Sequence, residues 1–234
     1  MMNYFIRMTV IFAILIALAA SLNVFAGENA AVALVTKTIQ TVSKKSPPAD
    51  WTKAVKGDPL ASGDQVQTGV KSLAVVKFID NSIVRVREQS ELTINGESKS
   101  ARLLSKEINM KKGAFGFDIK KQKQNEQFRF TSPTSVASIR GTTGTWYSGL
   151  LGDTLLTLTG LVNLLNAISD KDADVPAGYI GFCYPDGSIS VRQATQAELD
   201  AANNLLNGGS GTDIKLELRD SQGNKKDLHI KNKQ

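Results

Sequence analysis

Short runs in which apolar and polar residues alternate recur along most of the chain after residue 30. Residues 72–78 and 83–87 are two such runs, separated by the turn residues Asp80-Asn81-Ser82. Alternation with a period of two is typical of strands, and so short a connection predicts a β-hairpin. Further runs lie at residues 31–35, 92–94, 103–104, 108–110, 128–130, 136–139, 145–147, 155–158 and 161–165.

Many short strands at a spacing of roughly 8–12 residues predict an all-β fold, either a sandwich, a barrel or a solenoid. No strict repeat is visible, so a solenoid would be irregular. Phe115 and Phe117 are two residues apart, as are Phe128 and Phe130, so each pair faces one side of a strand. We interpret both pairs as core rather than as a stacking platform for ligands, because buried aromatic area commonly stabilises sheets.

Two segments depart from this pattern. Residues 118–127 are polar and basic, which predicts a solvated hairpin loop. Residues 195–206 predict a helix, because Thr195 and Glu198 have the spacing of a capping box. The apolar stripe expected on that helix comprises Leu199, Ala202 and Leu206, and its expected end is at Gly208 and Gly209.

The C-terminal tail predicts a flexible linker followed by a small hairpin. Residues 208–212 are rich in Gly and Ser, and the alternation of Ile214–Leu218 resumes at Leu228 and Ile230. Such a hairpin is too short to be stable alone, so we expect it to dock on the body, pair with another chain or stay partly disordered. Ile214–Ile230 is the appendage predicted to dock on a partner.

The N-terminus has the pattern of a secretory signal peptide. Arg7 precedes an apolar run at residues 10–20, and Val24-Phe25-Ala26 supplies small residues for cleavage after Ala26. We therefore expect a periplasmic or secreted protein, with a retained membrane anchor as the alternative. After cleavage, any membrane contact would be peripheral. The predicted organisation is a signal peptide (1–26), a β domain (27–192), a helix (193–207) and a linker with a hairpin tail (208–234).

The composition weighs against several enzyme classes. With one Cys and one His, the chain cannot form an internal disulfide, a zinc site built on several thiolates or a multi-histidine metal site. A hydrolytic triad could use only His229, which the lysine-rich hairpin makes a surface residue. Cys183 stands between Phe182 and Tyr184, so we favour a buried thiol over a reactive or intermolecular one.

Carboxylates leave one enzymatic option open. Asp58, Asp64 and Asp80 fall in turns, where Asp normally caps the backbone. Asp170, Asp172 and Asp174 are spaced like some calcium ligands, but the sixth-position Gly and closing Glu of a helix–loop–helix site are missing. We therefore expect structural turns and a solvated loop, and we predict no cofactor and no metal.

The formal net charge of +6 raises the question of an anionic partner. An exported location argues against nucleic acid. The lysines at residues 111–112, 120–123 and 225–226 could instead bind anionic envelope polysaccharide or lipopolysaccharide, although such runs are usually only solvated.

Two stretches carry most of the motif information. The first, from Gly63 to Ser82, links three turns, and the second, residues 132–142, leads through Pro133 into a strand that ends at Arg140-Gly141. Arg140 could bind a carboxylate or peptide carbonyls, but we favour an internal Arg that ties a turn to the body.

These motifs resemble those of the FecR-domain family: a G-D-x-(I/V)-x-T-G step, a D-G-S turn, a T-P or S-P segment leading into V-R-G-T, and a late G-x-V turn. The matching positions are Gly63, Asp64, Val66, Thr68, Gly69, Asp80, Ser82, Pro133, Arg140, Gly141, Thr142, Gly160 and Val162. The resemblance spans roughly residues 31–190 and implies an all-β, irregular β-helix-like or β-roll-like module. Asn81 replaces the usual Gly, which is mild because both residues tolerate a left-handed turn.

The resemblance implies a role in signalling without catalytic residues. Regulators of this family carry a cytoplasmic anti-sigma segment before the domain, whereas only residues 1–8 precede the apolar run here, so we do not carry over the anti-sigma role. We expect a non-enzymatic, exported adaptor that binds an envelope protein, such as an outer-membrane protein, through strand edges or turns. A binder of anionic envelope polysaccharide or lipopolysaccharide is the alternative, and a carboxylate enzyme is a third hypothesis.

Overall fold

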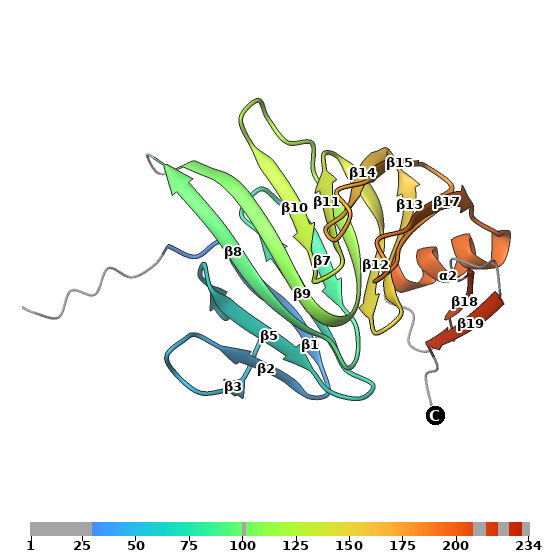
Figure 1. Cartoon of the computed structure of the whole chain (residues 1–234). Helices are drawn as coiled ribbons and strands as arrows, with labels where there is room; N and C mark the ends of the chain where they lie inside the picture. Colours follow the sequence, from blue (N-terminus) through green and yellow to red (C-terminus); the bar gives the residue numbers. More distant parts are fainter. Residues whose placement is uncertain (1–29, 100–101, 208–213, 220–224, 231–234) are drawn as a thin grey trace, which may run out of the picture. The chain divides into compact units, whose positions relative to one another are not determined.

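The structure is a computed structural model that describes residues 30–99, 102–207, 214–219 and 225–230. Its body consists of short strands and one following helix (Figure 1). The strands of the body are β1 (Ala33–Ile39), β2 (Val42–Lys45), β3 (Thr52–Lys53), β4 (Pro59–Leu60), β5 (Asp64–Thr68), β6 (Leu73–Phe78), β7 (Ile83–Val86), β8 (Glu91–Lys99), β9 (Arg102–Ile119), β10 (Gln127–Thr131), β11 (Ser135–Ile139), β12 (Thr142–Gly149), β13 (Gly152–Thr159), β14 (Leu161–Asn166), β15 (Asp172–Pro176), β16 (Tyr179–Cys183) and β17 (Ile189–Gln193). The helix is α2 (Gln196–Leu206), and β18 (Ile214–Arg219) and β19 (Lys225–Ile230) form a separate antiparallel pair.

The strands form two layers that share the long strand β9. The first layer has the order β4-β1-β6-β7-β9-β12-β13-β16-β17. The second has the order β3-β2-β5-β8-β9-β10-β11-β14-β15. Strand β9 lies in the second layer up to Lys112 and in the first from Gly113. The sheet is therefore continuous and folds back on itself through β9.

Gly113 permits the change of layer within β9. Its φ is +110°, and a Cβ at this position would lie 2.2 Å from Ser90 Oγ and 2.5 Å from Ser90 Cα. Only glycine accommodates both the positive φ and so close a neighbour. The chain enters β8 beside this point, so Ser90 and Gly113 mark two crossings between the layers.

The predicted all-β fold is confirmed, and of the architectures left open the structure has two packed layers. The strand pairs are antiparallel apart from β9–β10, which is parallel. The predicted β6–β7 hairpin is present: Lys77 pairs with Ile83, and Asn81 has a φ of +67°.

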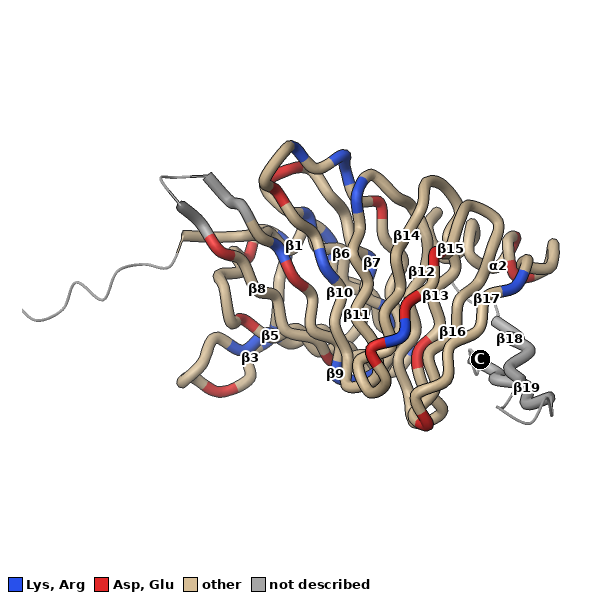
Figure 2. The backbone as a smooth tube through the Cα atoms, turned by 45° about the horizontal axis from the view of Figure 1, so that its top comes forward, with Lys and Arg blue, Asp and Glu red and all other residues tan. Residues whose placement is uncertain are grey.

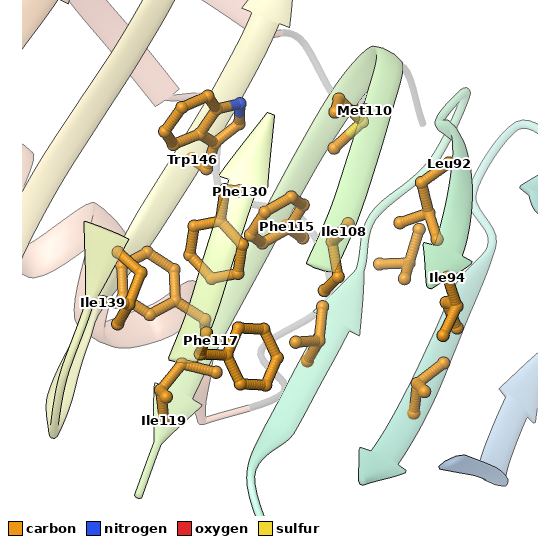
Figure 3. Close-up of a cluster of buried hydrophobic side chains, with 14 of the residues drawn as sticks. Leu92, Ile94, Ile108, Met110, Phe115, Phe117, Ile119, Phe130, Ile139 and Trp146 are labelled. Carbon is orange, nitrogen blue, oxygen red and sulfur yellow. The ribbon is translucent and has the colours of Figure 1, made fainter. Parts of the chain in front are cut away.

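The hydrophobic core lies between the two layers (Figure 3). The second layer contributes Leu92, Ile94, Ile108 and Met110, all about 1% exposed or less. The aromatic centre combines the two predicted core pairs. Phe115 and Phe117 come from the first layer, and their rings lie 4.7 and 4.8 Å from the ring of Phe130 in edge-to-face contacts. The interpretation of these phenylalanines as core is confirmed.

The interpretation of residues 118–127 as a hairpin loop is wrong. Strand β9 runs to Ile119, and the segment that follows crosses from the first layer to β10 in the second. Gln122 is only 2% exposed because its side chain donates to Asp80 Oδ2 (3.1 Å) and to the carbonyl of Lys120 (2.7 Å). A parallel pair requires such a crossover, which a local sequence pattern does not reveal.

The predicted helix is confirmed as α2, with Thr195 as its N-cap and a complete capping box to Glu198. The predicted stripe is confirmed in part: Ala202 is buried, and Leu199 is partly buried against the cluster to which Ala202 belongs. The buried face also includes Glu198, Ala201 and Leu205, which the stripe did not contain. Ala202 packs with Leu156, Ile180 and Phe182 of the first layer in a second apolar cluster. Glu198 tolerates burial because Arg192 binds it through two hydrogen bonds of 2.7 and 2.9 Å.

The helix ends at Leu206, where Asn207 is the C-cap with a φ of −81°. A left-handed cap is therefore absent at this residue, and the predicted cap glycines Gly208 and Gly209 lie outside the described residues. The predicted signal peptide also lies outside them. Within the described ranges, no helix has the length and apolar character needed to cross a bilayer.

Candidate functional site

The first group of motif residues stabilises crossings between the layers. Gly63 has a φ of +92°, and Asp64 Oδ2 accepts a hydrogen bond from the N–H of Ala61 (2.9 Å). Thr68 is buried, donates to the carbonyl of Arg87 and accepts from the N–H of Ser90 (3.0 Å). Buried hydroxyls thus satisfy backbone groups that leave the sheet ladder at the crossings.

Gly69 lies at the same end of the body as Thr68, opposite to Gly63 and Asp64. A Cβ at Gly69 would lie 3.2 Å from Thr41 Cβ, so the turn after β5 packs closely on the connection between β1 and β2. Ser72 Oγ accepts from the N–H of Thr41 (3.0 Å). The G-D-x-V-x-T-G step therefore holds turns and crossings through its motif positions Gly63, Asp64, Thr68 and Gly69.

Asp80 and Ser82 organise the other end of the body, where Asp80 forms an ion pair with the buried Lys106. Lys106 is 1% exposed, and its Nζ lies 2.9 Å from Asp80 Oδ2 and 5.9 Å from the ring centre of Phe128. Asp80 Oδ1 accepts from the N–H of Ser82 (2.9 Å), and Ser82 Oγ accepts from the N–H of Lys120 (3.1 Å). The turn predicted to cap its own backbone thus also neutralises a lysine from the second layer.

These contacts set the ionisation of Asp80. Burial alone would raise the pKa of this carboxyl, but hydrogen bonds from Lys106, the Ser82 N–H and Gln122, together with the charge of Lys106, hold it below the ordinary value. The carboxylate therefore stays ionised at neutral pH. Sequence reasoning missed Lys106, although its alternation with Ile108 and Met110 places it on the inward face.

The S-P segment builds a second buried polar cluster. Ser132 Oγ accepts from the N–H groups of Thr134 (3.1 Å) and Ser135 (3.0 Å) in the turn around the exposed Pro133. Ser132 and Ser135 both donate to Asp153 Oδ2, the latter at 2.6 Å. Asp153 is 2% exposed, and no described group bonds its Oδ1.

Burial raises the pKa of Asp153, and the hydrogen bonds from serines 132, 135 and 148 only partly offset it. Asp153 pairs with Cys183 across β13 and β16. Burial, together with the charge of Asp153, raises the pKa of the Cys183 thiol to about 12. The prediction of a buried thiol is confirmed, and its raised pKa disfavours the thiolate, which is the nucleophilic form.

The sequence favours an internal Arg140 that ties a turn to the body, and this prediction is wrong. It is exposed at the β11–β12 corner, and no described residue pairs with its guanidinium. Gly141 has a φ of +72°, and a Cβ there would lie 3.3 Å from Lys121 Cα, so the corner packs on the basic crossover. Gly160 also packs against this corner, because a Cβ added at Gly160 would lie 2.9 Å from both the Gly141 carbonyl oxygen and Thr142 Oγ1.

The structure thus gathers the motif residues into two groups. One end of the body holds Thr68, Gly69 and the turn around Pro133. The opposite end holds the other motif residues, which are Gly63, Asp64, Asp80, Ser82, Arg140, Gly141, Thr142 and Gly160.

The acidic segment after Ser169 is partly a strand rather than a loop. Asp172 and Asp174 lie in β15, where both accept hydrogen bonds from Asn163, at 2.7 and 3.1 Å. Among the described residues, no three potential ligands from His, Cys, Asp and Glu gather into a metal site. The side chain of His229 lies outside the described part of the chain.

Charges of both signs are interspersed over the body (Figure 2). Two lysines of the predicted anion-binding loops have acidic partners: Lys111 lies 2.8 Å from Glu91, and Lys120 lies 3.1 Å from Asp118. Lys121 and Lys123 are exposed beside the Arg140 corner. The side chains of Lys225 and Lys226 are outside the described part, so anionic polysaccharide binding stays a prediction.

The outer side of the second layer carries an uninterrupted polar row. Strand register aligns Gln65, Thr93, Asn109 and Thr131 across β5, β8, β9 and β10; we call these four side chains the polar face. Asn109 Nδ2 donates to Thr131 Oγ1 (3.0 Å). Helix α2 packs against β9, β12 and β13 of the first layer, so it lies away from this row (Figure 1).

The polar face borders a hollow of about 410 Å³. The Glu91–Lys111 ion pair and the turn at Ser132-Pro133 form its other walls. Amide and hydroxyl groups that both donate and accept hydrogen bonds suit a polar peptide segment. Gln65 and Pro133 fall within the two motif stretches, but the sequence did not bring them together with Thr93 and Asn109, because strand register is set by tertiary pairing.

Comparison with known proteins agrees with the motifs. A family model described as "FecR protein" matches residues 64–159. Residues 64–159 therefore match a FecR domain. The resemblance read from Gly63 through Gly160 is therefore confirmed, and the FecR domain coincides with the strands from β5 to β13.

The fold of the chain is similar to two crystal structures of "a putative anti-sigma factor from Parabacteroides distasonis ATCC 8503". The identities are 11% and 12%, and the TM-scores are 0.54 and 0.55. In both cases the similarity covers 73% of this chain and 85% of the other. No curated protein matches the chain.

Proposed function

We propose that this FecR domain protein is a non-enzymatic signalling adaptor that binds another protein. The observation that carries the proposal is the FecR domain itself, together with a fold shared with a protein described as an anti-sigma factor. Both point to regulation through protein contacts rather than catalysis. The acids with structural partners support this assignment, since the half-buried Asp80 is held by a lysine and the buried Asp153 by serines.

We assign the binding surface to the polar face and its hollow. The row presents short side chains with donors and acceptors at about 4.8 Å intervals, the spacing of neighbouring strands. A polar segment of the partner laid across β5, β8, β9 and β10 would meet one such group at each strand. The Glu91–Lys111 ion pair beside the row would orient the bound segment of the partner, because charged groups favour one register of that segment.

The proposed location is the periplasm or the outside of the cell, after cleavage following Ala26. The support is the signal-peptide pattern of residues 1–26. The proposed partner is accordingly an envelope protein, with an outer-membrane protein as one candidate.

A photo-crosslinking residue at position 109 tests the surface in living cells. The matched control places the same residue at Ser190, an exposed position on β17 in the first layer. We expect position 109 to crosslink one envelope protein, identified by mass spectrometry, and position 190 not to do so. Equal crosslinking from both positions, or crosslinking only to cytoplasmic proteins, would refute the assignment. Sequencing of the N-terminus in the same sample reports cleavage after Ala26.

A further inference from the structure

The β12–β13 hairpin turns through two leucines. Leu150 is fully exposed and Leu151 is 45% exposed, and the Gly149–Gly152 pair closes the turn. Residues at a hairpin turn are normally polar or glycine, since apolar side chains there gain nothing from the core. Contacts within the described body therefore do not account for leucines at positions 150 and 151, which we call the leucine tip.

A second apolar turn lies at the same end of the body. Val70, between β5 and β6, is 62% exposed. Its neighbour Gly69 accepts a hydrogen bond from the N–H of Gln89 (3.1 Å), and Gly113 packs on Ser90 and pairs with Ser148 beside the leucine tip. Three strand spacings, about 15 Å, therefore separate the two turns.

Cations accompany both apolar turns. Lys71 directly follows Val70, and Lys112 directly precedes Gly113; both side chains are exposed. The nearby Glu88 carboxylate accepts a hydrogen bond from the Lys71 N–H (2.6 Å). Ammonium groups beside protruding apolar side chains match the layering of an anionic bilayer, in which phosphates lie just outside the acyl chains.

The spacing of the turns favours a lipid surface over a protein. A protein interface needs a continuous apolar centre, whereas polar residues such as Gln89 and Lys112 lie between these tips. Fluid lipid accommodates separate protrusions. We propose that this end of the body docks on anionic membranes, with Leu150, Leu151 and Val70 entering the acyl boundary and Lys71 and Lys112 meeting the phosphates.

An environment-sensitive fluorophore tests the proposal at a single residue of the full chain. It is attached to Leu150→Cys, since the natural Cys183 is buried, and the control carries it on Leu161→Cys, an exposed leucine at the opposite end. Vesicles of phosphatidylcholine with about 30% phosphatidylglycerol are then added. Because each reading is local, binding of other segments to the vesicles does not produce the signal.

We expect a blue shift from position 150 and none from position 161. The double variant Lys71→Glu/Lys112→Glu should weaken vesicle binding at position 150 about tenfold or more, and added salt should do the same. The proposal is overturned by the absence of a shift at position 150, by equal shifts at both positions or by equal shifts with uncharged vesicles. A shift that appears without vesicles as the protein concentration rises would instead identify a second copy as the occupant.

Discussion

Asp80 and Lys106 form the ion pair on which one end of the body depends. Lys106 is fully buried, so its charge relies on a carboxylate 26 positions away in the β6–β7 turn. Removing one partner of a buried pair leaves an uncompensated charge, which is far more costly than replacing both.

We therefore expect Asp80→Ala to lower the free energy of unfolding by about 3–5 kcal/mol at neutral pH. The double variant Asp80→Asn/Lys106→Met should lose much less. Because the folded pKa of Asp80 is lowered, its contribution is present at neutral pH and is lost as the pH falls through that folded value. Denaturant unfolding of the three proteins measures these differences, and a loss under about 0.5 kcal/mol for Asp80→Ala would contradict the role of the pair.

For Asp153 we expect the free energy of unfolding to depend on pH in the opposite direction. Burial raises its folded pKa, so its stabilising contribution is complete below the ordinary value near 3.8 and is lost as the pH rises through the folded value. Asp153→Asn imitates the protonated form. Relative to the wild type, its stability should therefore improve between acid and neutral pH.

Thermal or denaturant unfolding between about pH 4 and 7 measures this trend for Asp153→Asn. The matched control is Asp50→Asn, at an exposed position, which should show no comparable change. A stability difference between Asp153→Asn and wild type that stays constant across the range would show that Asp153 does not titrate as proposed.

The role of a single residue could be predicted from the sequence when its contact partner is only a few positions away. Thr195 and Glu198 are three positions apart, so their capping box could be read from the sequence. The inward orientation of Lys106 could also have been read from its alternation with Ile108. Its partner could not, because the pairing depends on how β6, β7 and β9 meet in space.

At the scale of elements, the bend of β9 at Gly113 determines how the two layers connect. Gly113→Ala combines a strained positive φ with a clash against the Ser90 backbone. Gly57→Ala has a similar φ of +98° but no heavy atom within 4 Å. The pair therefore separates backbone strain from close packing.

We expect Gly113→Ala to destabilise the protein by at least about 2 kcal/mol more than Gly57→Ala. Equilibrium unfolding of both variants provides the comparison. Equal losses would mean that the Ser90–Gly113 contact does not constrain the bend.

Helix α2 and the segment after it should differ in importance. Deleting residues 194–234 uncovers Leu156, Ile180 and Phe182, so we expect a loss on the order of 5 kcal/mol and aggregation. Deleting only residues 208–234 should leave a folded, soluble body with weaker partner capture. Melting temperatures and capture assays of both truncations measure this, and unchanged capture by the shorter deletion would remove the tail from the binding account.

Elements built from local contacts were the ones that could be predicted. The β6–β7 hairpin and α2 follow from turn and capping residues within a few positions. The polar composition of residues 118–127 predicts a hairpin loop, because a loop and a crossover have the same composition. Only the parallel pairing of β9 with β10 distinguishes the two.

At the scale of the whole molecule, no helix of the described residues packs on the outer side of β5, β8, β9 and β10. The all-β class could be predicted from the alternation of residues, and the family from ordered turn motifs. The polar face could not, because Gln65, Thr93, Asn109 and Thr131 are aligned only by strand register. The motif positions mainly hold the layers together, and only Pro133 among them borders the proposed binding surface.

The most direct test of the central claim is the dissociation constant for the purified envelope protein captured at position 109. Wild type is compared with Asn109→Arg on the polar face and with Ser190→Arg, which adds the same charge at an exposed site of the first layer. We predict that Asn109→Arg weakens binding at least tenfold, by about 1.4 kcal/mol, while Ser190→Arg leaves it unchanged. Unchanged binding by Asn109→Arg, or an equal loss in both variants, would contradict the polar face as the site of partner binding.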